Sequence, residues 1–125
     1  MHPGFCVSIQ SHHDLIVWQR GMDLAAEAYR LAKHMPREEQ YRITGQLLRA
    51  ATSIPANIAE GHSRGTRKDY AHFVTIARGS FAETETLLLL IAKVGLLDDT
   101  QVRHALTLCA EVGKMLNALL SRLRE

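Results

Sequence analysis

Residues 46–61 read QLLRAATSIPANIAEG, and this stretch decides the fold. Apolar side chains recur in steps of three and four on both sides of Pro55, at Ile43, Leu47, Ala51, Ile54 and Ile58. This spacing predicts one face of a helix that continues through the proline. Because Pro55 cannot donate to the carbonyl of Ala51, an isolated helix would lose roughly 3 kcal/mol there. We therefore expect tertiary packing to compensate.

Polar side chains form a second line with the same period on this helix. Its members are Gln46, Arg49, Ser53, Asn57 and Glu60. We expect Ser53 and Asn57 to form hydrogen bonds near Pro55 that reach Ser80, where Gly79 lets the helices approach. Gly61 is placed to end the helix. The segment therefore predicts a structural element with an apolar and a hydrogen-bonding face, more readily than an active site.

Four segments with the helical interval of apolar residues are joined by short connections. They cover Asp14 to Met35, Pro36 to Glu60, Thr66 to Gly95 and Asp98 to Leu123. Asp14 is a plausible N-cap, and Thr66 with Asp69 and Asp98 with Gln101 resemble capping boxes. No segment alternates as a strand does. The predicted fold class is therefore all-α, an antiparallel up-down-up-down four-helix bundle over residues 14–125, preceded by a loose N-terminal tail over residues 1–13.

Composition excludes several classes of protein. With 125 residues and 46% apolar content the chain suits one domain, and a formal charge of +2 does not by itself indicate nucleic-acid binding. Cys6 and Cys109 lack the close spacing of zinc or redox motifs, so we expect reduced thiols and a cytoplasmic protein. The longest apolar run, Leu87 to Ala92, is far shorter than the ~20 residues that cross a bilayer. We expect no signal peptide and no membrane partner.

The run from Leu87 to Ile91 predicts self-association. Five consecutive aliphatic residues advance about 100° each and cover the whole helix circumference, whereas a bundle helix buries one face. We expect a second copy to cover the remainder, in a homo-oligomer whose interface contains Leu87, Leu89, Leu90, Leu96 and Leu97. The alternative is a broad core stripe with one or two exposed leucines.

A basic cluster surrounds the predicted start of the third helix. Arg64, Arg67 and Lys68 lie at this helix N-terminus, where unpaired amides and the helix dipole favour phosphate, and Arg78 follows on the same helix. These four residues are the candidate contacts to RNA or DNA. The alternative is that the loop arginines are solvated. For Arg49, pairing with Glu60 or a neighbouring helix is the favoured interpretation.

No pattern favours catalysis. Asp69 and His72 have the i, i+3 spacing of a di-iron bundle ligand pair, but such bundles need two such pairs and further inward carboxylates. Ser53, Ser63 and Ser80 lack the strand-turn-helix context of a hydrolase nucleophile. We expect no enzyme, no cofactor and no metal.

Several stretches resemble the bacterial four-helix bundle family named for proteins encoded by intervening sequences within 23S ribosomal RNA genes. The matching stretches are LIVWQ at 15–19, Gln46, RAA at 49–51, SIPANIAEG at 53–61, Arg64 and IARGSFAETE at 76–85. The resemblance implies a small cytoplasmic bundle that assembles as a homo-oligomeric ring, with a pentamer as the expected form. A related branch, the accessory variability proteins of diversity-generating retroelements, binds a reverse transcriptase and nucleic acid through a basic surface. The family offers no established catalytic residues.

The leading interpretation is a non-enzymatic oligomeric binding or scaffold protein that contacts RNA or DNA phosphates through Arg64, Arg67, Lys68 and Arg78. The alternative is a protein-binding adaptor that has no nucleic-acid role. Salt separates the two, because phosphate contacts make affinity fall steeply as the salt concentration rises.

Overall fold

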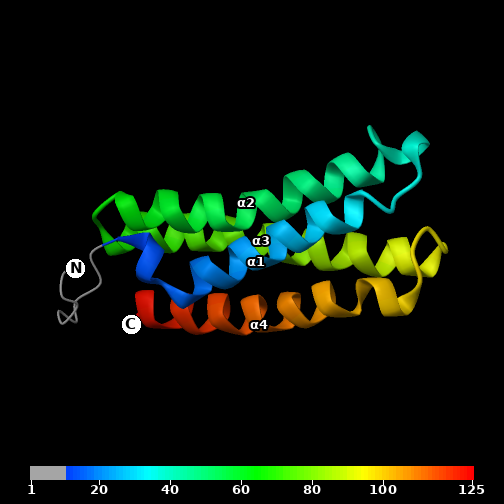
Figure 1. Cartoon of the computed structure of the whole chain (residues 1–125). Coiled ribbons are helices and arrows are strands. Elements are labelled where there is room, and N and C mark those ends of the chain that lie inside the picture. The colour runs from blue at the N-terminus through cyan, green and yellow to red at the C-terminus, as the bar shows by residue number, and fades with distance from the viewer. Residues whose placement is uncertain (1–10) are drawn as a thin grey trace.

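The computed structural model describes residues 11–125, and within them it contains four α-helices and no strand. The helices are α1 (Ile16–Ala32), α2 (Ile43–Ser63), α3 (Arg67–Lys93) and α4 (Asp99–Leu123). Each helix packs against the next one in the chain, and α4 returns to pack against α1. The α2–α3 turn and the end of α4 lie at one end of the molecule, as Figure 1 shows. The expected all-α up-down-up-down bundle is confirmed.

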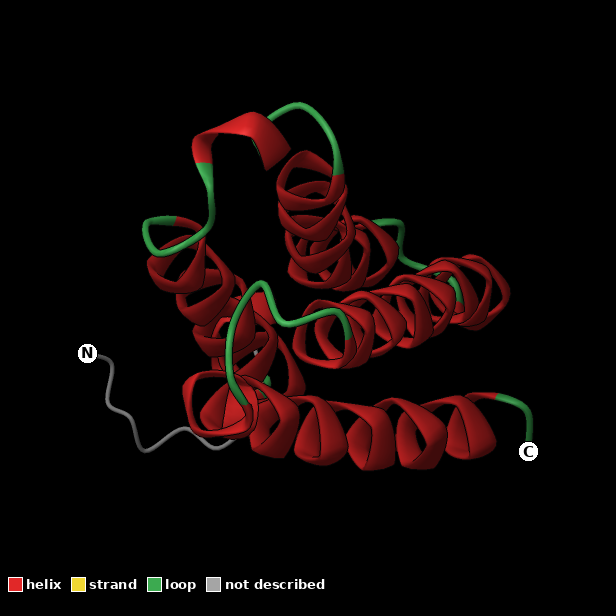
Figure 2. Cartoon of the chain, turned by 90° about the vertical axis from the view of Figure 1, so that its right-hand side faces the viewer, coloured by secondary structure: helices red, strands yellow, loops and turns green. Residues whose placement is uncertain are grey.

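The order around the bundle places two faces opposite each other. Contacts join α1 to α2, α2 to α3, α3 to α4 and α4 to α1, with none across either diagonal of the described bundle. The face made by α1 and α2 is therefore opposite the face made by α3 and α4. Figure 2 views the bundle from the end that carries the α1–α2 and α3–α4 connections.

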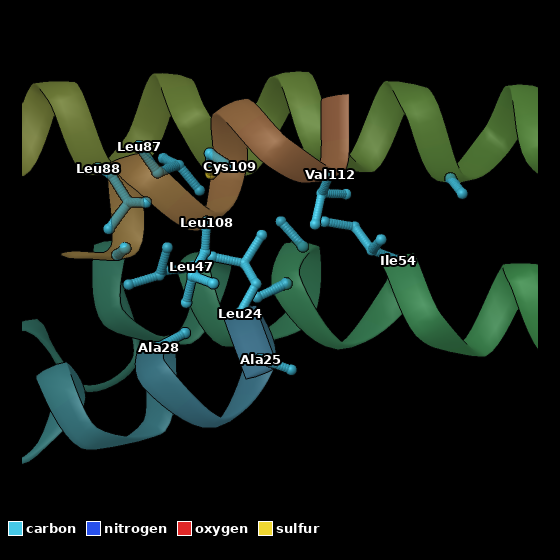
Figure 3. Packing of buried hydrophobic residues seen from close by; sticks show 14 of the residues in the cluster. Leu24, Ala25, Ala28, Leu47, Ile54, Leu87, Leu88, Leu108, Cys109 and Val112 are labelled. Atoms are coloured by element: carbon cyan, nitrogen blue, oxygen red, sulfur yellow. The ribbon is translucent and has the colours of Figure 1, made fainter. Parts of the chain in front are cut away.

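One hydrophobic core fills the space between the helices. Figure 3 shows side chains from all four of them converging, among them Leu24, Leu47, Leu88 and Leu108. Cys109 belongs to this core, and burial raises the pKa of its thiol to about 12. The apolar line expected on α2 lies on the core side, with Leu47, Ala51, Ile54 and Ile58 buried and Ile43 half-buried.

The helix α2 runs without interruption through Pro55, as the sequence pattern predicts. The proline is buried and faces Gly21 of α1. A Cβ at Gly21 would lie 3.4 Å from Ile54 Cγ2 and 3.6 Å from Pro55 Cβ, which are ordinary contact distances, so α1 packs directly on this turn. Close packing against α1 thus supplies the expected compensation for the missing hydrogen bond.

Two expectations about glycine are wrong. Gly61 does not end α2, which continues to Ser63, and the left-handed residue of the turn is Gly65 with φ of 90°. A Cβ at Gly61 would lie 2.7 Å from Phe73 Cβ, so this glycine permits the close approach of α2 and α3. A Cβ at Gly79 would meet nothing within 4 Å, whereas one at Gly113 would lie 2.5 Å from Phe81 Cζ. Close approach therefore depends on Gly61 and Gly113 and not on Gly79.

The predicted second helix starts too early. Pro36 has an extended ψ of 142°, a short 3₁₀ turn covers Arg37–Glu39, and α2 begins only at Ile43. No side chain between Arg37 and Arg42 is buried, so packing provides nothing to stabilise a regular α-helical turn there. The first helix likewise ends at Ala32, although Met35 beyond it is still buried.

The N-terminal boundary also differs from the prediction. Leu15 occupies the N-cap position of α1, and a 3₁₀ turn covers His12–Asp14. The rings of His12 and His13 lie 5.1 and 5.0 Å from the ring of Trp18, so both rings lie against the start of α1. The rest of the predicted tail, residues 1–10, lies outside the described residues.

The capping box predicted for α4 is observed in full, whereas at α3 only the bond to the Thr66 side chain is present. Thr66 Oγ1 accepts from the amide of Asp69 at 3.1 Å. Asp98 Oδ1 accepts from the amide of Gln101 at 2.8 Å, and Gln101 Oε1 accepts from the amide of Asp98 at 2.9 Å. These bonds satisfy amides that a helix start leaves unpaired, and they fix where both helices begin. Within residues 11–125, no helix combines the length and the apolarity that a membrane crossing requires.

Candidate nucleic-acid interface

The arginines with polar side-chain partners divide into two groups within the described part of the chain. Four make ion pairs with carboxylates: Arg20, Arg30, Arg42 and Arg64. Three donate to neutral acceptors: Arg67, Arg78 and Arg124. All three in the second group lie along the seam between α3 and α4, and we call them the α3–α4 basic strip.

Each guanidinium of the strip bridges the two helices. Arg67 Nη2 donates to the carbonyl oxygen of Arg122 at 2.6 Å. Arg78 Nη1 donates to Asn117 Oδ1 at 3.4 Å, and Arg124 Nη2 donates to Thr75 Oγ1 at 3.4 Å. The three contacts lie at the protein surface, so the guanidinium groups remain open to solvent; the contact of Arg67 is short, and those of Arg78 and Arg124 are long and weak.

Helix geometry explains why the strip is straight. Arg67 and Arg78 are eleven residues apart, which is close to three full turns, so both project from the same side of α3 over about 16 Å. The antiparallel arrangement places the last turn of α4 beside the first turn of α3 (Figure 1), which brings Arg124 between them at Thr75. The strip therefore follows from the topology together with the helical period.

The surroundings of the strip are predominantly basic. Segments 67–82 and 113–125 contain six basic residues, the strip together with Lys68, Lys114 and Arg122, and two acidic residues, Asp69 and Glu125. The chain as a whole has a formal charge of only +2. The positive charge is therefore unevenly distributed, and these two segments are more basic than the rest of the chain.

The structure separates the four residues predicted to contact nucleic acid. Arg67 and Arg78 belong to the strip, and Lys68 is exposed beside Arg67. Arg64 differs, because its Nε lies 2.7 Å from Glu60 Oε2 and its guanidinium stacks 5.0 Å above the ring of Phe73. Since this charge is already compensated, we leave Arg64 out of the candidate interface.

Sequence reasoning missed Arg124. The signal was available, because an antiparallel third and fourth helix must bring the end of one beside the start of the other. Basic residues in the last turn of α4 were therefore candidates for the same surface as Arg67 and Lys68.

Two members of the polar line on α2, Ser53 and Asn57, form the expected hydrogen bonds, whereas Gln46, Arg49 and Glu60 are exposed. Ser80 Oγ donates to Ser53 Oγ at 2.9 Å, and Asn57 Nδ2 donates to both the carbonyl oxygen and the Oγ of Ser53 at 2.8 Å. The network joins α2 to α3 without the help of Gly79. Glu60 pairs with Arg64 and not with Arg49. The guanidinium of Arg49 lies over Gly45 of the same helix, where its Nη1 would be 3.3 Å from a Cβ added to the glycine.

The structure also separates the leucines expected at an oligomer interface. Leu87 and Leu97 are only 8% and 3% exposed, so they belong to the core of the single chain. Leu89 and Leu90 are 53% and 43% exposed, and Leu96 is half-buried. Only the last three still offer surface to a partner.

The sequence also raised the question of a metal site and of the three serines as nucleophiles. Among residues 11–125, no three His, Cys, Asp or Glu side chains lie close enough together to hold a metal ion. Ser53 and Ser80 are hydrogen-bonded to each other, and Ser63 donates to the carbonyl oxygen of Glu60.

Comparison with known proteins identifies relatives of the chain. A solved structure from Bacteroides thetaiotaomicron VPI-5482, described as a protein with unknown function from the S23 ribosomal protein family, matches with a TM-score of 0.78 and 26% identity. The match covers 84% of this chain and 98% of the other. No curated protein matches significantly. The family model described as 23S rRNA-intervening sequence protein matches residues 13–118, and the chain belongs to this family.

Proposed function

We propose that the protein is a non-enzymatic binding protein that holds RNA or DNA by the phosphates through the α3–α4 basic strip. The observation that carries this proposal is the neutral anchoring of Arg67, Arg78 and Arg124. A guanidinium has five N–H donors, and each of these arginines uses one of them in its hydrogen bond to a neutral oxygen. The other donors and the whole positive charge are free for a phosphate.

Neutral anchoring matters because of what binding would cost. An arginine that is paired with a carboxylate must give up an ion pair before it can contact a phosphate. An arginine held by a carbonyl, amide or hydroxyl oxygen keeps its charge, and it has already lost part of its side-chain freedom. The strip therefore offers charges that are both available and partly pre-organised.

The dimensions of the strip favour a polymer over a small anion. Arg67 and Arg78 are about 16 Å apart along α3, so one phosphate cannot engage both. A nucleic-acid backbone repeats its phosphates along a strand and can engage the strip at several points. A role as a cytoplasmic scaffold for RNA or DNA fits this geometry.

We also propose that copies of the chain associate through two opposite apolar surfaces. The first, the α1–α2 groove, has a volume of about 410 Å³ and is lined by Trp18, Met22, Tyr29, Pro55, Ala56 and Ala59, among others. The second, the α3–α4 groove, has a volume of about 760 Å³ and is mostly apolar, with Leu89, Ala92, Val102, Leu106 and Ala110 in its lining. Its polar lining residues are Lys93, Asp99, Arg103 and Thr107.

The occupant that we propose for these surfaces is a second copy of this chain. Each chain carries both surfaces, and Met22, Tyr29 and Leu89 leave large apolar side chains exposed on them. The two grooves lie on opposite faces of the chain. When the α1–α2 groove of one copy contacts the α3–α4 groove of another, the pair therefore still has one free groove of each kind. Head-to-tail contacts form a ring where the rotation between copies closes and an open filament where it does not. Of the two, we propose the ring, because the family resemblance implies a ring with five copies.

The second candidate function, a protein adaptor without nucleic acid, is favoured by the same apolar grooves. A reverse transcriptase remains a partner that only the family resemblance predicts.

A series of salt concentrations distinguishes a protein adaptor from a nucleic-acid-binding protein. Fluorescence anisotropy with labelled structured RNA and duplex DNA should show binding at 50 mM salt, with log affinity falling by about 0.9 per phosphate contact for each tenfold rise in salt on duplex DNA. Absence of binding to both at 50 mM salt would overturn the proposal.

A further inference from the structure

We infer that the α3–α4 basic strip binds the phosphates of double-stranded nucleic acid in preference to single strands, and without regard to base sequence. This inference rests on the proposed function and specifies its ligand. It follows from what surrounds the strip, from the rigidity of the two helices, and from the width of the surface on which the strip lies.

Within residues 11–125, the strip has no free Trp, Tyr or Phe side chain beside it on which a base could stack. Trp18 and Tyr29 lie on α1, and Tyr41 precedes α2, so these three belong to other parts of the molecule. Single-strand binding proteins combine a basic groove with aromatic rings, because unpaired bases stack on them. Such proteins gain much of their affinity from this stacking.

The tyrosine and phenylalanine rings of α3 itself are also occupied. Phe81 packs against α4 at Gly113, where a Cβ would lie 2.5 Å from its Cζ. Phe73 lies beneath the guanidinium of Arg64, and the ring of Tyr70 meets the ring of His62 edge-on at 5.5 Å. In the described part of the chain, the strip can therefore offer a single strand its charges but no free tyrosine, phenylalanine or tryptophan ring.

A duplex suits a rigid row of charges better than a single strand does. The strip is fixed on two packed helices by contacts that cross the seam. A duplex presents phosphates at fixed positions, and at 3.4 Å per nucleotide the strip of about 16 Å spans about five base pairs. A flexible strand must lose conformational freedom to follow the same line. It also releases fewer counterions per contact, with a salt slope of about 0.7 instead of 0.9.

The width of the surface excludes base reading in the major groove. An α-helix with side chains is about 10–12 Å across, and packed helices lie about 8–10 Å apart, so the α3–α4 face is roughly 20 Å wide. The major groove is only about 12 Å wide and admits one helix. A strip that lies on the seam between two helices therefore meets the phosphates that border the groove and does not reach the base edges.

The experiment is a set of anisotropy titrations with the full chain at 50 mM salt. Its probes are two DNA duplexes of unrelated sequence, one RNA duplex, and an oligothymidylate of the same length as one strand, all of about 20 nucleotides per strand. We expect the two DNA duplexes to agree within about threefold and the oligothymidylate to bind at least tenfold more weakly. Binding of the oligothymidylate as tightly as the duplexes, or a tenfold difference between the two DNA sequences, would overturn the inference and leave the proposed function intact.

The variant R67Q/R78Q/R124Q tests whether the preference for double-stranded nucleic acid comes from the strip. Its duplex affinity should fall to the level of the oligothymidylate, and its circular dichroism should show that the bundle is folded. A preference for the duplex that persists at full strength in this folded variant would also overturn the inference. If no probe binds to the wild-type chain, the proposed function fails and the inference fails with it.

Discussion

Arg67 Nη2 donates to the carbonyl oxygen of Arg122 at 2.6 Å and so joins the first turn of α3 to the last turn of α4. The last carbonyls of a helix have no partner within it, and a basic side chain from another helix can satisfy one of them. The same guanidinium keeps its remaining donors exposed. A contact that aligns two helices thus also fixes a charge of the α3–α4 basic strip.

The substitution Arg67→Gln should affect binding far more than stability. The loss of one exposed hydrogen bond should lower the free energy of unfolding by no more than about 1 kcal/mol in urea denaturation. The salt slope for duplex DNA should fall by about 1, because one phosphate contact is lost. Arg64→Gln is the matched control, since Arg64 is paired with Glu60, and it should leave the slope unchanged. An unchanged slope for Arg67→Gln would exclude this arginine from the interface.

Two glycines should respond to alanine in opposite directions. Gly113→Ala places a Cβ 2.5 Å from Phe81 Cζ, so the ring must move, and we expect a loss of about 1–3 kcal/mol of stability. Gly79→Ala meets nothing within 4 Å and should add about 0.5–1 kcal/mol, because alanine loses less backbone entropy in a helix. Urea denaturation of both variants measures the difference. Equal effects at the two positions would contradict the described packing of α3 and α4.

The buried thiol of Cys109 should resist modification in the native protein. Burial raises its pKa to about 12 from a reference of 9.0, so the nucleophilic thiolate is scarce at pH 8. In a Cys6→Ser background, a disulfide reagent should react slowly with the native chain and readily in urea. Fast reaction under native conditions would place Cys109 at the surface.

The same shift in pKa predicts how stability depends on pH. Above pH 9 the unfolded chain releases the thiol proton while the folded chain retains it, so Cys109 favours unfolding increasingly between pH 9 and about 12. In urea denaturation at pH 8 and at pH 10.5, Cys109→Ala should lose less stability across this interval than the parent chain. Equal losses would show that the thiol does not titrate as described.

Complementary variants test head-to-tail association. Met22→Arg blocks the α1–α2 groove, and Leu89→Arg blocks the α3–α4 groove. Each variant alone should be monomeric by light scattering, because every contact needs both surfaces. An equimolar mixture should form a dimer, in which one intact surface from each variant meets the other. A monomeric wild-type chain, or a mixture that stays monomeric, would refute the proposed association.

The helices were predictable because their signals are local. The period of apolar residues, the caps at Thr66 and Asp98, and the continuation through Pro55 each depend on neighbours a few residues away. The structure of residues 37–42 was not predictable in this way. The acidic residues there are typical of a helix start, but no buried side chain stabilises a helix in this region.

Features that depend on contacts between helices were harder to predict. Spacing alone does not say that Gly61 faces Phe73 while Gly79 faces open space, since this depends on how the helices rotate against each other. The pairing of Arg124 with Thr75 likewise joins residues 49 positions apart. The ion pair between Arg64 and Glu60, in contrast, could have been predicted from the sequence, because the two residues are four positions apart on a helix.

The most direct test of the account compares two variants that lose the same charge. R67Q/R78Q/R124Q removes the strip, and R20Q/R42Q/R64Q removes three arginines that are paired with carboxylates. The measurement is the affinity for one duplex of about 20 base pairs at 100 mM salt. Three lost contacts at a slope of about 0.9 each predict a loss of more than about 100-fold for the strip variant, with the paired variant within about threefold of wild type. Equal losses in both variants, or wild-type affinity in the strip variant, would contradict the account.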